Sequence, residues 1–200
     1  MRICLFAGIA VLLCSTWASA FEITPVGTFQ YSTIYNPPST TAGTGWGYGL
    51  MLGQYVHADD VEIESGVLYF SRSENMGNPT FLTSTFNYLQ VPVLVRVRPK
   101  NSHCTFGVGG YYAHGVGNIE DQPTDAASTY VSYEQEQLSR EDFGALAAFG
   151  FRWEFAHALE FYSDARFAYG MKNINLAPGG QTEQWRDYLQ FLVGVSLLIR

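Results

Sequence analysis

The sequence has few cysteines, few charged residues and only one long hydrophobic run. Two of its three cysteines, Cys4 and Cys14, lie in the first twenty residues, so the rest of the chain keeps Cys104 alone and can form no internal disulfide. Charged residues make up 14% of the chain and the formal net charge is −7, which gives no electrostatic reason to expect nucleic-acid binding. With 47% hydrophobic residues, the 200-residue chain suits one ordered domain.

The one long hydrophobic run stands at the N-terminus and has the features of a signal peptide. Arg2 precedes the apolar stretch Ile3–Cys14, and Ala18-Ser19-Ala20 fits the small-residue pattern of a cleavage site. We therefore predict that residues 1–20 are a cleaved signal peptide and that residues 21–200 form the mature domain.

Two other interpretations of the N-terminal run are less well supported. A retained membrane helix needs about twenty apolar residues, and this run is shorter. A lipid anchor on Cys14 is disfavoured because the preceding Leu13 is bulkier than the small residue usual at that place. After residue 20 no apolar run approaches the length of a spanning helix, so a helical crossing of a bilayer is excluded there.

The rest of the chain alternates between apolar and polar residues with the period of β-strands. In Tyr88–Pro99, every odd position from Leu89 to Val97 is apolar, whereas the even positions include Gln90, Arg96 and Arg98. No amphipathic helix competes with this pattern. Eight strands are predicted at Phe21–Thr33, Gly45–Val56, Val61–Arg72, Tyr88–Pro99, Cys104–His114, Phe143–Phe155, Ala158–Gly170 and Asp187–Ile199.

The connections between these segments are alternately long and short. Short turns alternating with longer loops are typical of outer-membrane barrels, whose turns are periplasmic and whose long loops face outward. The sequence thus predicts an all-β fold, an eight-stranded antiparallel up-and-down transmembrane β-barrel with short periplasmic turns and long outer loops, in the bacterial outer membrane. The long connections are Ile34–Thr44, Ser73–Thr85, Gly115–Glu141 and Met171–Arg186.

The side of each strand that carries charge supports a membrane barrel over a soluble one. In lipid the sheet must close on itself and its outward row must be apolar, while the lumen tolerates charge. Eight strands enclose a lumen just wide enough for side chains to fill, so we expect mutually neutralising ion pairs rather than an open pore. This predicted structural network comprises Glu62, Glu64, Arg96, Arg98, Arg152, Glu154, Glu160, Asp164 and Arg166.

Proline and aromatic residues add two local expectations. Pro92 has no backbone N–H, and because a closed barrel has no edge strand, we predict a β-bulge at Gln90–Val93. Aromatic residues lie near both ends of the strands, which predicts girdles at two bilayer interfaces. The girdle beside the long loops comprises Tyr31, Trp46, Tyr69, Tyr112, Phe143 and Tyr169, and the other comprises Phe21, Trp153 and Phe155.

Two motifs resemble the PorT-like outer-membrane β-barrel family. Tyr88-Leu89-Gln90-Val91-Pro92-Val93-Leu94-Val95 is similar to that family's Tyr-Leu-Glu-Ile-Pro-Leu-Leu strand, with Gln90 replacing the usual acid. Arg166–Ile174 is similar to its Arg-Tyr-x-x-Gly-Leu-x-Asn-Ile segment, and the resemblance covers essentially all of Phe21–Arg200. The chain ends on Leu-Leu-Ile-Arg rather than on the aromatic residue of many outer-membrane proteins. The resemblance implies an eight-stranded outer-membrane barrel but no single biochemical activity.

These observations favour a non-enzymatic barrel that acts through its outer loops in surface interaction or envelope integrity. We expect it to be a monomer with no cofactor, metal or catalytic residues, surrounded by outer-membrane lipid and lipopolysaccharide, with an unknown surface or envelope partner on the loops. A soluble periplasmic barrel that binds an apolar ligand is disfavoured by the charged inward rows. Two acidic groups, Glu62 with Glu64 and Glu120 with Asp121 and Asp125, are weak candidates for calcium.

The alternative function is an outer-membrane enzyme of the lipid A deacylase type. It would need a hydroxyl nucleophile, a histidine base and an acid to orient it. The His-x-Ser-Asn motif of such enzymes is absent, and His114 with Ser128, Ser132 and Glu134 has no diagnostic spacing. The three other histidines, His57, His103 and His157, are expected in solvated turns.

Overall fold

The computed structural model describes most of the chain after the predicted signal peptide. Residues 1–17, which hold most of that predicted segment, lie outside the described residues, and the first strand begins at Ala18. Within the described residues, no helix has the length and hydrophobicity that crossing a bilayer requires. The described residues are 18–36, 39–56, 61–76, 82–100, 102–122, 128–132, 138–173 and 185–199.

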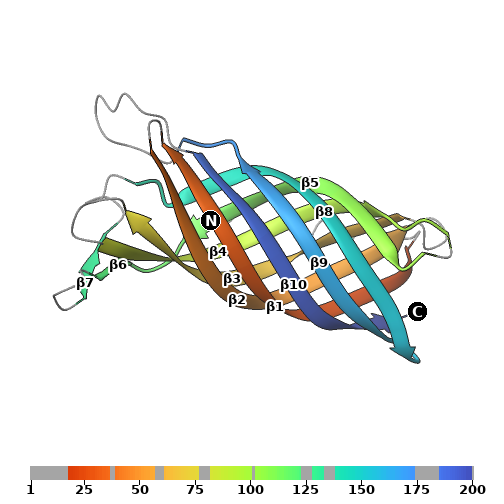
Figure 1. Ribbon diagram of the computed structural model, residues 1–200. Helices are drawn as coiled ribbons and strands as arrows, with labels where there is room; N and C mark the ends of the chain where they lie inside the picture. The colour runs from red at the N-terminus through yellow and green to blue at the C-terminus, as the bar shows by residue number, and fades with distance from the viewer. Residues whose placement is uncertain are drawn as a thin grey trace.

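Eight long antiparallel strands form a closed barrel (Figure 1). Neighbours around the wall follow the order β3-β2-β1-β10-β9-β8-β5-β4, and the pairing of β3 with β4 closes the ring. The predicted eight-stranded antiparallel barrel is thereby confirmed. The barrel strands are β1 (Ala18–Asn36), β2 (Ser39–Val56), β3 (Val61–Met76), β4 (Leu82–Val97), β5 (Cys104–Gly115), β8 (Glu141–Ala156), β9 (Leu159–Gly170) and β10 (Trp185–Ile199).

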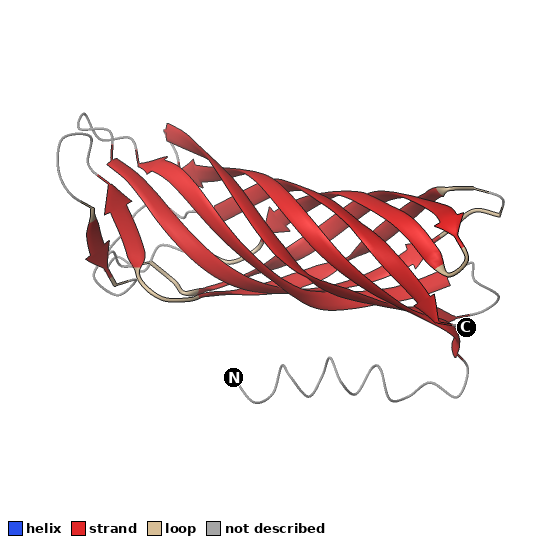
Figure 2. Ribbon diagram, turned by 90° about the horizontal axis from the view of Figure 1, so that it is seen from below, coloured by secondary structure: helices blue, strands red, loops and turns tan. Residues whose placement is uncertain are grey.

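The two ends of the barrel differ in their connections (Figure 2). At one end, which we call the turn end, the strands are joined across residues 57–60, 98–103 and 157–158. At the other, the loop end, the connections span 37–38, 77–81, 116–140 and 171–184.

The strands at the loop end are longer than expected. Residues 34–36 and 39–44, predicted to be loop, continue β1 and β2 in register as far as the pair Asn36 and Ser39. The β3–β4 ladder likewise continues to the pair Met76 and Leu82. Most residues of these segments are polar or small in the sequence, which favoured loops, but each segment extends a ladder that is already in register, which leaves the backbone groups paired.

Two short strands in the longest connection were not expected. β6 (Ile119–Gln122) pairs with the loop end of β4 beyond the point where β5 stops, and β7 (Thr129–Val131) pairs with β6. The hydroxyl of Ser84 in β4 donates to Asp121 Oδ1 in β6 at 2.5 Å. Asp121, a weak calcium candidate from sequence, is thus a buried acceptor that joins the connection to the wall.

The inward and outward rows of each strand have opposite character. In β4 the inward residues alternate strictly with exposed ones, and Val93, Val95 and Val97 are 46%, 50% and 48% exposed on the outer wall. Arg96, between two of these valines, is 1% exposed in the lumen. Hydrocarbon therefore covers the outside of the barrel, and charge is inside it.

The predicted bulge at Gln90–Val93 is wrong. The β4–β5 ladder runs through Pro92 without a shift, with Pro92 opposite Tyr111, and the β3–β4 register is the same before and after the proline. The side chain of Ser65 on β3 donates a hydrogen bond of 2.9 Å to the Pro92 carbonyl. The β3–β4 pairing is absent at Pro92 itself, and there the Ser65 hydroxyl is the donor to the Pro92 carbonyl. The strand therefore accommodates proline without an extra residue.

Glycine on β2 allows neighbouring strands to approach closely. A Cβ atom at Gly47 would lie 2.2 Å from the Tyr69 carbonyl oxygen, and one at Gly49 would lie 2.3 Å from that of Val67. Both distances are far below van der Waals contact, so a side chain at either position would displace the β3 backbone. Glycine at these places suits the strong curvature of a narrow barrel.

We expect Ser65→Ala to lower the free energy of unfolding by about 1 kcal/mol, because the Pro92 carbonyl loses its side-chain donor. The matched control is Ser163→Ala on the outward row of β9, whose hydroxyl makes no hydrogen bond to the described residues. Urea unfolding in lipid vesicles measures both effects. Equal stability of the two variants would contradict the role assigned to Ser65.

Candidate functional site

The lumen at the turn end is filled by a group of charged side chains that we call the turn-end cluster. Its centre is Arg152 on β8, whose Nη2 lies 2.9 Å from both carboxylate oxygens of Glu62. Arg152 Nη1 donates to Glu22 and, at 2.9 Å, to the hydroxyl of Tyr55. The cluster comprises Glu22, Tyr55, Glu62, Glu64, Arg96, Arg98, Arg152, Glu160, Tyr162, Asp164 and Arg166.

Two further arginines share two carboxylates across the lumen. Arg166 donates to Glu64 Oε1 through Nη2 and to Asp164 Oδ2 through Nε, each at 2.7 Å. Arg96 binds the same two carboxylates, with its Nε 3.1 Å from Glu64 Oε2. The Tyr162 hydroxyl donates to Glu64 Oε2 at 3.2 Å. These bonds join three strands, β3, β4 and β9, so each ion is held from several directions.

Arg98 and Glu160 form the outermost pair of the cluster. Arg98 Nη2 lies 3.2 Å from Glu160 Oε2, and the two side chains are 25% and 7% exposed. The same nitrogen donates to Tyr55 at 3.3 Å. Among the described charged residues of the cluster, Arg98 is therefore the most accessible to water.

Eight of the nine charged residues predicted for the lumen lie in this cluster, and Glu154 does not. Glu154 is exposed near the turn end of β8, although it still pairs in register with the inward Glu160, because the β8–β9 register shifts only after it. The following turn at His157 and Ala158, where Ala158 has φ 65°, ends the hairpin. Glu154 therefore continues the inward row, but it lies at the end of the strand and its carboxylate is outside the network.

A second group of charges, the loop-end cluster, was missed by the sequence analysis. Arg72 Nε lies 2.8 Å from Glu74 Oε1, and Arg186 Nε lies 3.5 Å from the same oxygen. Glu74 and Arg186 stand in segments that were expected to be loops. Both nevertheless continue the inward row of their strand, which is the signal that could have placed them. The cluster comprises Arg72, Glu74, Phe86, Tyr88, Tyr111, Asp142 and Arg186.

Aromatic rings complete the loop-end cluster. The guanidinium carbons of Arg72 and Arg186 lie 5.1 Å and 5.3 Å from the centre of the Tyr88 ring, within cation–π range. Arg186 Nη1 also donates to the Tyr88 hydroxyl at 2.8 Å. The hydroxyl of Tyr111 donates to Asp142 Oδ1 at 3.2 Å. The lumen is thus packed with rings as well as ions, which the alternation of charged residues alone did not indicate.

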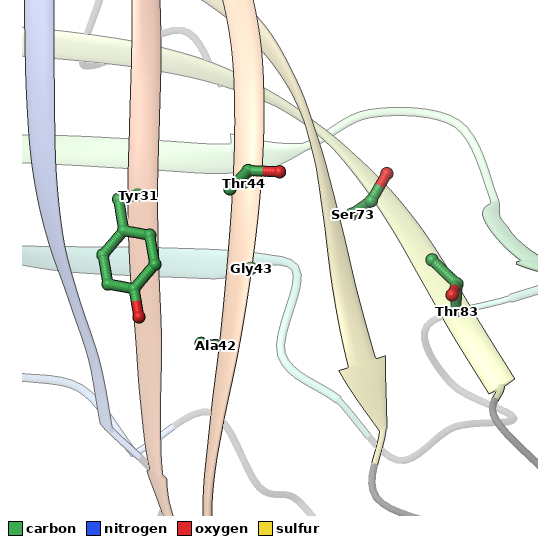
Figure 3. A pocket seen from close by; sticks show the side chains of 6 residues that line it. All are labelled: Tyr31, Ala42, Gly43, Thr44, Ser73 and Thr83. Carbon is green, nitrogen blue, oxygen red and sulfur yellow. The ribbon is translucent and has the colours of Figure 1, made fainter.

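A groove of about 220 Å³ lies on the outer wall towards the loop end (Figure 3). Tyr31 is the one large side chain beside it, and its hydroxyl points along β1 towards the loop end. Thr44, Ser73 and Thr83 are small hydroxyl residues, and Ser73 shares a hydrogen bond of 2.9 Å with Thr85. Uncharged hydroxyl groups can exchange hydrogen bonds with polar headgroups or with sugars.

Only part of the constellation weighed for the enzyme alternative, namely His114, Ser128 and Ser132, lies within the described residues. His114 lies in β5, and its cross-strand neighbour is Glu141. The Glu141 carboxylate accepts a bond of 2.9 Å from Lys172, which holds the pKa of Glu141 below its usual value. Glu134 lies outside the described residues. Asp125 and His57 do so as well, and the described part of the chain holds no group of three or more metal-ligating side chains.

Arg152→Ala is expected to lower the free energy of unfolding by about 3–5 kcal/mol, because it leaves Glu22 and Glu62 buried without their cation. The control Glu154→Gln removes an exposed charge and should change stability by less than about 0.5 kcal/mol. Urea unfolding in lipid vesicles measures both. A small effect of Arg152→Ala would show that the cluster is not coupled to folding.

The comparisons with known proteins concern the fold. No protein-family model and no curated protein sequence matches the chain. The crystal structure of outer membrane protein OprG from Pseudomonas aeruginosa is similar, with a TM-score of 0.55 and 14% identity over 92% of this chain and 98% of that one.

Two further crystal structures have the same architecture. Ail, the attachment invasion locus protein of Yersinia pestis, solved with the heparin analogue sucrose octasulfate, has a TM-score of 0.51 and 12% identity over 90% of this chain and 99% of that one. Neisserial surface protein A has a TM-score of 0.51 and 10% identity over 88% and 96% of the two chains. The chain therefore has the fold of the small, eight-stranded outer-membrane β-barrels.

Proposed function

We propose that the chain is an integral protein of the bacterial outer membrane, exported by its N-terminal signal peptide and without enzymatic activity. The observation that carries this proposal is the sidedness of the wall. Val93 and Val95 are about half exposed, whereas Arg96 and Arg166 are 1% and 0% exposed in the lumen. A barrel in water would expose its ions and bury its hydrocarbon, whereas a barrel in lipid does the reverse.

Aromatic side chains on the outer wall support the same location. Trp46, Phe143 and Tyr169 project outward towards the loop end and are 65%, 46% and 54% exposed. Trp153 and Phe155 project outward near the turn end and are 55% and 53% exposed. Two such bands are expected where an outer wall meets two bilayer interfaces.

Lipid and lipopolysaccharide are the partners that this wall suits. The apolar residues between the two aromatic bands offer a surface for acyl chains. The outer groove lies beyond Trp46 on the loop-end side, where its hydroxyl groups can reach headgroups. Its described lining carries no charged side chain, which favours hydrogen bonding to neutral headgroup atoms over pairing with phosphate.

The loop end is where we place the physiological role, in surface interaction or envelope integrity. With the turn end in the periplasm, the β6–β7 hairpin projects to the cell surface, where Tyr130 is 69% exposed. An exposed tyrosine is a common anchor of protein interfaces. We further propose that the barrel acts as a monomer and is related to the PorT-like family, on the strength of the β4 motif Tyr88–Val95 and the β9 motif that begins at Arg166.

Membrane fractionation and gel migration test the location. The mature chain should sediment with outer membranes and should migrate differently on gels before and after boiling, because a closed barrel resists unfolding by detergent. Recovery of the chain in the soluble periplasmic fraction, and not with outer membranes, would refute the proposal.

Val93→Arg should destabilise the barrel by about 2–4 kcal/mol in lipid vesicles, because it places a cation on the lipid face near the middle of the wall. The matched control is Tyr130→Arg in the β6–β7 hairpin, which we place in water and which should change stability by less than about 0.5 kcal/mol. Urea unfolding of the inserted barrel measures both variants. Equal effects would contradict the assignment of Val93 to lipid.

A further inference from the structure

Between the two charged clusters the lumen contains a layer of amides, the glutamine layer, made of Gln30, Gln90 and Gln190. All three side chains are 0% exposed. Gln30 and Gln190 face each other on the paired strands β1 and β10. Gln90 comes from β4, which is not a neighbour of β10, and its Nε2 donates to the Tyr188 hydroxyl at 2.5 Å, so this bond crosses the lumen.

The register places this layer in the middle of the barrel. Gln190 is the cross-strand neighbour of Arg166, which belongs to the turn-end cluster. On the other side, Gln30 is paired with Gly45, whose neighbour on β3 is Arg72 of the loop-end cluster. The amides therefore separate two groups of ions that do not contact each other through any hydrogen bond among the described residues.

Most polar atoms of the glutamine layer have no partner among the described residues. Both amide atoms of Gln30 and of Gln190 lack a hydrogen bond, as do Oε1 of Gln90 and Oγ1 of the adjacent Thr28. Buried polar atoms are almost always satisfied by protein or by ordered water, since leaving them unpaired is costly. A ligand that both donates and accepts would satisfy these atoms.

The chemistry of the lining identifies that ligand. The layer contains no ionised side chain, so it lacks the opposite charge that a buried ion requires. An amide offers two donors and an acceptor with two lone pairs, and a hydroxyl offers both functions. Water satisfies such a mixture, and a water molecule in a polar protein interior typically makes about three hydrogen bonds.

We propose that the glutamine layer binds a small cluster of ordered water, and that this water occupies a compartment closed by an ion cluster at each end. The barrier to water and ions is then double. A continuous aqueous path requires that the loop-end cluster and the turn-end cluster be opened together, because either one alone still blocks the lumen.

Nuclear magnetic resonance of the barrel in detergent micelles tests the water. Magnetisation transfer from water to the side-chain amide protons of Gln30, Gln90 and Gln190 is expected in the native chain. In the variant Gln30→Leu with Gln190→Leu, which removes most of the polar lining while keeping its bulk, transfer to Gln90 should fall at least about fivefold. Native amides that receive no magnetisation from water would overturn the proposal.

Conductance across a planar bilayer tests the double barrier. One variant removes a matched pair from the turn-end cluster (Arg152→Ala with Glu62→Ala), and another removes one from the loop-end cluster (Arg72→Ala with Glu74→Ala). Each should conduct no more than the native chain, whereas the variant with all four substitutions should conduct at least about tenfold more than either.

Folding of every variant is checked by heat-dependent gel migration. An absence of increased conductance is therefore interpreted only for a variant that has folded and inserted. If one pair alone opens the lumen as widely as both pairs, or if a correctly folded fourfold variant stays closed, the double barrier is refuted. Both outcomes can occur whether or not the loops have a partner, so this test is independent of the proposed surface role.

Discussion

Closure of the sheet by the β3–β4 pairing is the constraint on which the rest of the structure depends. Without it, β3 and β4 would each present a row of unpaired backbone groups, which hydrocarbon cannot satisfy. With it, the inside and the outside of the wall become two separate environments. The outward row can then be apolar. Charged residues such as Arg152 and Arg166 lie in a lumen so narrow that their side chains contact carboxylates.

We expect ion pairing in this lumen to contribute to the specificity of the fold more than to its stability. Burying an arginine is expensive, and a well-packed apolar replacement of a whole buried pair is often no worse. Arg96, Arg152 and Arg166 nevertheless bind carboxylates on β1, β3 and β9. These ion pairs form only when strands that are far apart in sequence are in the observed register. A strand displaced by two residues would keep its inward and outward rows but would lose these bonds.

The sequence predicts the fold better than it predicts the lumen. Two-residue alternation is a local property, so the strand predicted at Tyr88–Pro99 and the inward rows of Glu62, Arg96 and Asp164 could be placed from neighbouring residues alone. The contacts across the lumen depend on the stagger between strands, which no local pattern records. Arg186 and Glu74 were missed because they lie in segments that were expected to be loops, and the β6–β7 hairpin was missed because its strands are short. Glu154 was misplaced because alternation does not show where the lumen ends along a strand. The prediction of a bulge at Pro92 considered only backbone donors, whereas the Ser65 side chain donates to the Pro92 carbonyl.

The strands on one flank are longer than those on the other, and this gives the loop end an oblique rim. β1 and β2 contain 19 and 18 residues, whereas β5 and β9 contain 12 each. β6 and β7 add to the taller flank, because they pair onto β4 there (Figure 1). Among the described residues, the loop end is therefore higher on the side of β1 to β4, so a macromolecule approaching it along the barrel axis would contact that side first.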